Sequence, residues 1–288
     1  MRFWSVFNEA PGWCRVPVKL LIFAIVLVLV LFPRPRLLVR QIDRLRHLDR
    51  LIDPRAPKLD AVVRRFQADL PENLTPRQIR KRVQAFVYET IPYDWDWNTW
   101  DVADYIPTVG ELMAKGREDC DGRAVLAASL LRRLGQKASL ATDLRHIWVV
   151  VERDELMGPG GWKSAVSTPK GTRVHWRTVG NVPRSLAFGV AVFPLARELI
   201  VLVTIVALLL HPKMPRRWLG AGVVLLLGGW VFLRLAVTVS SDFRGTVERD
   251  WASWVGLVLV VGGLGCLAWA SRRGRRRIGS VDASGSVG

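Results

Sequence analysis

The chain is poor in the residues that build metal centres and disulfide frameworks. Its 288 residues include only three cysteines and four histidines, and no two cysteines have a short ligand spacing such as Cys-x-x-Cys. Structural zinc sites and disulfide-stapled folds need such clusters. The sequence therefore predicts no metal and no other cofactor. Cys14 and Cys266 lie beside or inside apolar runs, whereas Cys120 stands alone between them.

Acidic residues are also few relative to basic ones, with 25 Asp and Glu against 42 Lys and Arg and a formal net charge of +17. Strongly basic chains often bind nucleic acid. Here the basic residues flank apolar runs, and no nucleic-acid motif accompanies them. The positive-inside bias and anionic lipid headgroups explain that placement. The expected partner is the lipid bilayer, and no nucleic-acid partner is predicted.

Half of the residues are hydrophobic, and they concentrate in runs long enough to suggest membrane spans. The runs cover residues 20–32, 186–210, 218–239 and 251–270. The sequence PRPR follows the first run, where a signal peptide would need small residues, so this run is expected to be an uncleaved anchor. The pattern predicts four transmembrane α-helices.

The basic residues between the runs predict a topology. The loop HPKMPRR at 211–217 carries three basic residues and no acidic one, which favours the cytoplasm. Both termini would then be cytoplasmic, and residues 33–185 would be extracytoplasmic in a multi-pass membrane protein. The arginine-rich stretch after the first run opposes this orientation, but long segments translocate largely regardless of charge.

Composition divides the chain into five expected regions. These are an N-terminal tail with the first transmembrane helix (1–32), a basic amphipathic helical arm (33–70), a soluble domain (71–184), three transmembrane helices (185–270) and a basic, then disordered tail (271–288). In the arm, Leu38, Ile42 and Leu45 recur at helical spacing with arginines between them. This helix could pack on its own domain or lie on lipid headgroups.

Two charged residues in the apolar runs are expected at the same depth in the membrane. Under the predicted topology Glu198 and Arg234 each lie about five residues from the extracytoplasmic end of neighbouring spans. A charge at mid-bilayer costs about 2.5–3.5 kcal/mol. The two side chains are therefore expected to pair, or else to reach the outer interface separately.

The stretch GREDCDGRAVLAASLLRRLG, residues 116–135, places Cys120 in a polar turn ahead of an apolar helical face. Gly135 is a good helix stop. A cysteine at a helix N-terminus has a lowered thiol pKa, although Asp119 and Asp121 oppose the thiolate. The strand-like HIWVVV begins at His146, and a cysteine on a helix with a histidine on a later strand suits a thiolate–imidazole pair.

Two further segments carry local signals. Thr75 and Gln78 in TPRQ form a capping box that opens a helix. Trp95, Trp97 and Trp100 alternate with acidic residues in IPYDWDWNTWD, which suits either a wall beside a cleft or ordinary core packing.

The run from YETIPYDWD through the Cys120 stretch to HIWVVV resembles a transglutaminase-like domain of the microbial membrane-anchored kind, over residues 75–170. The resemblance implies an α+β, papain-like core, with Cys120 as nucleophile and His146 as general base and acid. It also implies acyl transfer from peptide or protein amides through a thioester. Hydrolysis and cross-linking share that thioester, so both stay open.

One position departs from the family pattern. In GGWKSAVSTPKG, Ser167 or Val166 stands where the family has an aspartate that completes the triad. Asp154 is the nearest acid after His146 and could substitute. Alternatively Cys120 and His146 work as a dyad, or the domain is a catalytically degenerate binding module on a membrane anchor.

Overall fold

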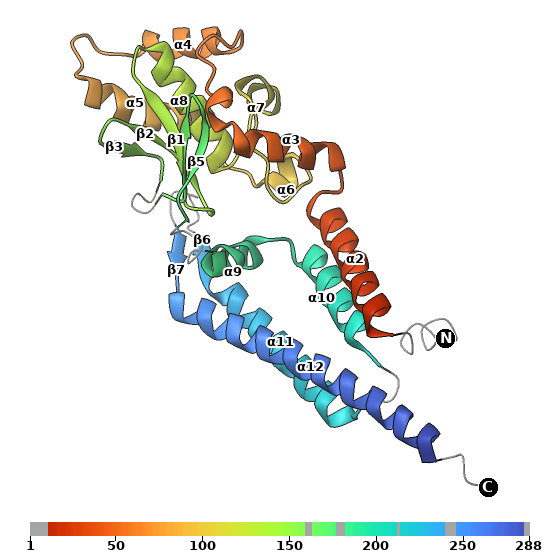
Figure 1. Ribbon diagram of the computed structural model, residues 1–288. Helices are drawn as coiled ribbons and strands as arrows, with labels where there is room; N and C mark the ends of the chain where they lie inside the picture. Colours follow the sequence, from red (N-terminus) through yellow and green to blue (C-terminus); the bar gives the residue numbers. More distant parts are fainter. Residues whose placement is uncertain (1–10, 159–162, 177–181, 212–213, 240–245, 285–288) are drawn as a thin grey trace. The chain divides into compact units, whose positions relative to one another are not determined.

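The computed structural model describes residues 11–158, 163–176, 182–211, 214–239 and 246–284 (Figure 1). The chain divides into two compact units. The first, here called the sheet unit, runs from Leu31 to Val182. The second, here called the apolar unit, combines Met1–Val30 with Pro183–Gly288. Each unit is described by itself.

The sheet unit is built on one five-stranded antiparallel sheet with the order β3-β2-β1-β4-β5. Its strands are β1 (Ala138–Thr142), β2 (Ile147–Val151), β3 (Asp154–Leu156), β4 (Ala165–Thr168) and β5 (Gly171–Val174). The β1–β2 hairpin aligns Thr142 with Ile147, and β4 pairs with the other edge of β1. The mixed α+β class expected from the sequence is thus observed.

Helix α8 is the centre of this unit. It packs on β1 and β2, and helices α4, α5 and α7 pack around it (Figure 1). Every residue from Asp121 to Leu131 is buried, because sheet and helices enclose it together. The helices of the unit are α3 (Pro35–Arg46), the 3-10 turn η1 (Leu48–Leu51), α4 (Leu59–Ala68), α5 (Pro76–Thr90), α6 (Asp96–Thr99), α7 (Val109–Lys115) and α8 (Cys120–Arg133).

The predicted helix start at Thr75 is confirmed. Thr75 caps α5, its side chain accepting from the Gln78 main chain while the Gln78 side chain accepts from the Thr75 main chain. The segment 33–70 does not form a separate arm. Leu48, Leu59 and Phe66 lie in the same hydrophobic core as α8 and the sheet, so one core extends across the boundary expected at residue 70.

Among its described residues, the apolar unit contains three helices long and apolar enough to cross a membrane, within α2 (Gly12–Leu31), α11 (Arg216–Leu235) and α12 (Asp250–Ser284). The expected span at 186–210 is instead a broken pair, α9 (Val182–Val192) and α10 (Leu195–Leu209), bent by 119°. Pro194 at the break lacks the N–H that a continuous helix needs. A count of four spans holds only if this bent pair is one span.

Helices α11 and α12 pack through glycines, and a short ladder of β6 (Val237–Val239) with β7 (Thr246–Glu248) joins them. A Cβ at Gly229 would come within 2.7 Å of the Gly256 carbonyl oxygen, and one at Gly263 within 2.9 Å of the Gly222 oxygen. Such close backbone approach is typical of helix pairs in lipid. Helix α12 continues through the basic segment to Ser284, where the sequence predicted a disordered tail. Residues 285–288 lie outside the described part.

The expected ion pair in the apolar unit is confirmed. Arg234 Nη1 lies 2.5 Å from Glu198 Oε2, and the same guanidinium donates to the Phe193 carbonyl oxygen at 3.0 Å. Trp230 Nε1 also donates to Glu198, at 2.9 Å. The pair therefore stabilises the helix break, since Arg234 satisfies a carbonyl that the interrupted helix leaves open.

Candidate active site

Cys120 is the first residue of α8, as predicted. Asp119 is the N-cap, and its carboxylate accepts from the Asp121 main chain at 3.0 Å. Asp, Asn, Ser and Thr favour such a start because their side chains accept from the open N–H groups of the first turn. The helix is buried from Asp121 to Leu131, so Cys120 sits at the partly exposed end of a rigid element.

Helix α8 packs on the histidine strand β2. The main chain of Ile147, the first residue of β2, lowers the pKa of the Cys120 thiol. His146 precedes Ile147 directly, so the fold brings the helix N-terminus and the His146–Ile147 peptide together. The closeness of the His146 imidazole to the Cys120 sulfur stays a prediction.

The β1–β2 turn that carries His146 is held by a residue that the sequence analysis missed. The carboxylate of Asp143 is buried and accepts from the main-chain N–H of His146 at 2.9 Å and of Arg145 at 3.0 Å. Arg145 also forms an ion pair with it at 2.7 Å. Asp143 therefore fixes the backbone of His146, and an aspartate three residues before the histidine was the available signal.

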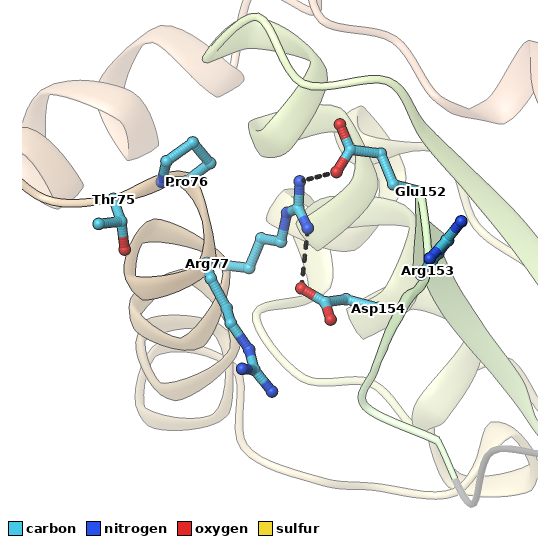
Figure 2. Close-up of a pocket in the computed structure, with 7 residues that line it drawn as sticks. Thr75, Pro76, Arg77, Glu152, Arg153 and Asp154 are labelled. Atoms are coloured by element: carbon cyan, nitrogen blue, oxygen red, sulfur yellow. Dashed lines mark hydrogen bonds and ion pairs between the residues drawn. The ribbon is translucent and has the colours of Figure 1, made fainter.

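Asp154 cannot orient His146. It pairs with Val151 at the opposite end of β2, five residues from His146, which is roughly 16 Å along a strand. Its carboxylate forms an ion pair with Arg80 at 2.8 Å, beside a second pair between Arg80 and Glu152. These groups line a cavity of about 540 Å³ between the start of α5 and the β2–β3 hairpin (Figure 2). The suggestion that Asp154 completes a triad is therefore wrong.

Ser167 has a structural role. It is buried in β4, and its hydroxyl accepts from the Leu140 N–H at 2.8 Å, which ties β4 to β1. Strand β1 lies between β4 and the histidine strand β2. The position where the resemblance predicts an aspartate is thus separated from His146 by a whole strand.

Five carboxylates surround the start of α8, and we call them the acidic cluster. They are Asp96, Asp104, Glu118, Asp119 and Asp121. Their oxygens, together with the Cys120 sulfur, form three overlapping groups whose atoms lie within 4.8 Å of one another. Carboxylate oxygens at such spacing could hold a hard divalent cation such as Ca²⁺. The expectation of no metal was based on the lack of Cys and His ligand spacing, and the fold brings Asp96 and Asp104 to the carboxylates at 118–121.

Burial dominates the electrostatics of the cluster. It raises the pKa of Asp96, and the neighbouring Asp119 and Glu118 raise it further. Burial also raises the pKa of Asp121, with Asp119 adding to the effect. Burial and the charge of Glu118 raise the pKa of Asp119 as well, although Arg123 lowers it in part. The Arg123 guanidinium donates to the Ile91 carbonyl oxygen at 2.7 Å rather than to a carboxylate. The carboxyl groups of the cluster thus keep their protons to a higher pH than free acids do.

The same surroundings raise the pKa of the Cys120 thiol. Burial is the largest cause, followed by the charges of Asp121 and Asp119, while the hydrogen bond from Ile147 lowers it. The thiol proton points to Asp121 Oδ1, with a sulfur–oxygen distance of 3.3 Å. The helix dipole expected to lower this pKa is therefore outweighed, and the resting group is a neutral thiol that needs a base before it attacks.

The tryptophan segment divides into two roles. Trp100 is core: it packs on Tyr105, and its Nε1 donates to Glu118 at 2.7 Å. Trp95 and Trp97 are half-buried and stack at 4.6 Å between ring centroids. The preceding residues run beside the site, since Glu118 exchanges main-chain hydrogen bonds with Pro92 and Asp94. The aromatic pair therefore lies on a segment that borders the cysteine turn.

The site is thus assembled from the α8 N-terminus, the β1–β2 turn and the acidic cluster. Its definition rests on this geometry and on the resemblance of its motifs. Comparison of the chain with protein families, with characterised proteins and with solved structures finds no match.

Proposed function

We propose that the sheet unit is a cysteine-dependent acyl-transfer or amide-hydrolysing domain that acts on peptide or protein amides. The observation that carries the proposal is the position of Cys120, which is the half-buried first residue of α8, a helix that packs on the strand β2 directly after His146. A thiol held at a helix start beside a histidine turn has the elements of covalent catalysis.

The proposed reaction has two steps. His146 takes the thiol proton as the sulfur attacks the amide carbonyl carbon, and the C–N bond then breaks as the imidazolium returns that proton to the leaving amine. The product is a thioester on Cys120. In the second step water or another amine attacks the thioester, His146 removes its proton, and the thiol is released. Asp143 is a positioning residue, because it holds the His146 main chain.

We further propose that the apolar unit anchors this domain as a multi-pass membrane protein with the sheet unit on the extracytoplasmic side. The three long apolar helices support the anchor. The basic loop before α11 supports the orientation.

The alternative is a catalytically degenerate binding module. It is favoured by two observations: neither Asp154 nor Ser167 reaches His146, and burial raises the pKa of the thiol. Incubation of the detergent-solubilised full chain with a library of peptide amides, followed by peptide mass spectrometry at mildly acidic pH, separates the two. An acyl-transfer domain should trap a Cys120 thioester from a library of peptide amides. A binding module should form no adduct on Cys120 with any of them.

A further inference from the structure

Helix α3 presents polar side chains to the interior of the sheet unit. Gln41, only 2% exposed, donates to Asp104 Oδ2 at 2.6 Å and accepts from the Ile106 N–H at 2.9 Å. Arg44 donates to the Ile106 carbonyl oxygen at 2.7 Å and pairs with Glu111 at 2.8 Å. The helix is therefore attached to its domain largely through hydrogen bonds and an ion pair.

Apolar side chains of the same helix face outwards. Val39, Ile42 and Leu45 follow one another at three-residue spacing and are 68%, 43% and 41% exposed. This arrangement reverses the usual one, in which a surface helix buries its apolar stripe and exposes its polar side. A contiguous exposed apolar stripe marks a contact with another phase or partner.

Basic residues accompany the stripe. Arg36 and Arg46 are exposed on the same helix, and the exposed Arg40 lies 3.6 Å from Glu111 of the domain. An apolar stripe together with arginines is the composition of helices that lie in the headgroup layer of a bilayer, where an anionic surface attracts basic residues.

The covalent chain holds α3 beside a membrane span. Helix α2, which is long and apolar enough to cross a membrane, ends at Leu31, and α3 begins at Pro35. Four residue steps reach at most about 14 Å. The start of α3 therefore stays within that distance of the end of α2, whatever the placement of the two units.

We propose that α3 lies in the headgroup layer of the membrane that α2 crosses, with Val39, Ile42 and Leu45 inserted toward the acyl chains. The occupant of the apolar stripe is the bilayer itself, because it is the one apolar phase that the tether guarantees to be within reach.

The docking also sets the class of substrate, a consequence that rests on the proposed function. Gln41 binds Asp104, whose carboxylate lies within 4.8 Å of that of Asp121, and Asp121 accepts from the Cys120 thiol. The reactive thiol is thus three side chains from the membrane-docked helix. The amides that reach it are those of membrane-anchored peptides and proteins.

Spin-label accessibility tests the docking. Single cysteines replace Val39 or Ile42 in a full-length chain carrying Cys14→Ser, Cys120→Ser and Cys266→Ser, and the labelled protein is reconstituted in vesicles of phosphatidylcholine and phosphatidylglycerol. A matched control label replaces Arg64, an exposed residue of α4. We expect labels at 39 and 42 to collide several-fold more with oxygen than with a water-soluble nickel complex, and the control to show the reverse. Nickel access at 39 and 42 equal to that of the control would overturn the proposal.

Because these proteins lack Cys120, the docking result is independent of catalysis. The substrate consequence is tested with Val39→Gln/Ile42→Gln, which weakens insertion but leaves the thiol in place. Turnover of a lipid-anchored peptide amide should fall several-fold, while turnover of the same peptide free in detergent should be unchanged. An equal fall for both peptides would refute the consequence. Inserted labels, together with no turnover of either peptide by the wild-type protein, would instead reject the proposed function and leave the docking intact.

Discussion

Buried carboxylates occur in both units, and they are treated in opposite ways. In the apolar unit Glu198 has a matched cation, Arg234, and a second donor, Trp230. In the sheet unit the acidic cluster brings five carboxylates and a thiol together, and the adjacent Arg123 directs its hydrogen bonds to a carbonyl. In the apolar unit the carboxylate is paired with a cation, whereas in the sheet unit the carboxylates neighbour one another.

The two sites therefore differ in what their carboxylates need. A buried carboxylate with a cation beside it needs no further group. In the acidic cluster, burial and neighbouring like charges raise the pKa values of Asp96 and Asp121 and disfavour their ionised forms. The following predictions test this contrast.

The largest effect is expected for Cys120→Ala. Amide turnover should fall by at least about 10⁴-fold, because no thioester can form. Cys14→Ala and Cys266→Ala are matched controls and should retain activity, and circular dichroism should show all three variants folded. Turnover that survives in Cys120→Ala means that the nucleophile is another residue.

Removing Arg234 should destabilise the apolar unit by about 3–5 kcal/mol, since Glu198 is then left buried without a cation. Removing Glu198 should cost less, because the Arg234 side chain is 30% exposed. Arg234→Leu and Glu198→Leu would each lower the thermal midpoint of the protein in detergent. The double variant should recover much of the loss. A loss in the double variant equal to the sum of the two single losses would show that the pair contributes no coupling.

Removing one charge from the acidic cluster should instead stabilise the sheet unit. The folded-state pKa of Asp96 is raised, so its contribution to stability is complete below the unfolded pKa of about 4 and is lost as pH rises through the folded value. Asp96→Asn should therefore add on the order of 1 kcal/mol at pH 8 and little at pH 4. Unfolding curves at both pH values measure this, and a destabilised variant at pH 8 would contradict it.

The smallest effect is expected for Asp121→Asn. The charge of Asp121 and its hydrogen bond both raise the pKa of the Cys120 thiol, so the variant should have more thiolate at neutral pH. Iodoacetamide should alkylate Cys120 faster, by about ten-fold for each pKa unit removed. Alkylation of Cys266 serves as the internal control. An unchanged rate at Cys120 would show that burial alone sets its reactivity.

Local signals were sufficient for several features. The capping box at Thr75 and the helix start at Cys120 depend on contacts within four residues, so the sequence predicts them directly. The Glu198–Arg234 pair followed from depth along two spans. The break at Pro194 was missed although its signal was present, since a proline inside an apolar run removes a helical N–H.

The misassignment of Asp154 has a geometric cause. Asp154 is close to His146 in the sequence, but it lies in the β2–β3 hairpin at the far end of β2. There it forms an ion pair with Arg80. Counting the strand residues would have excluded it, because each adds about 3.3 Å.

Hydrophobic periodicity and local capping were enough to predict the apolar helices and the position of Cys120 at a helix start, whereas the α+β class was expected only from the family resemblance. Three features required the folded structure: the strand order that separates Ser167 from His146, the assembly of the acidic cluster and the outward-facing apolar stripe of α3. Each of these depends on contacts between segments far apart in the chain. Their free energy is set by burial and by neighbouring charges, which no local pattern encodes.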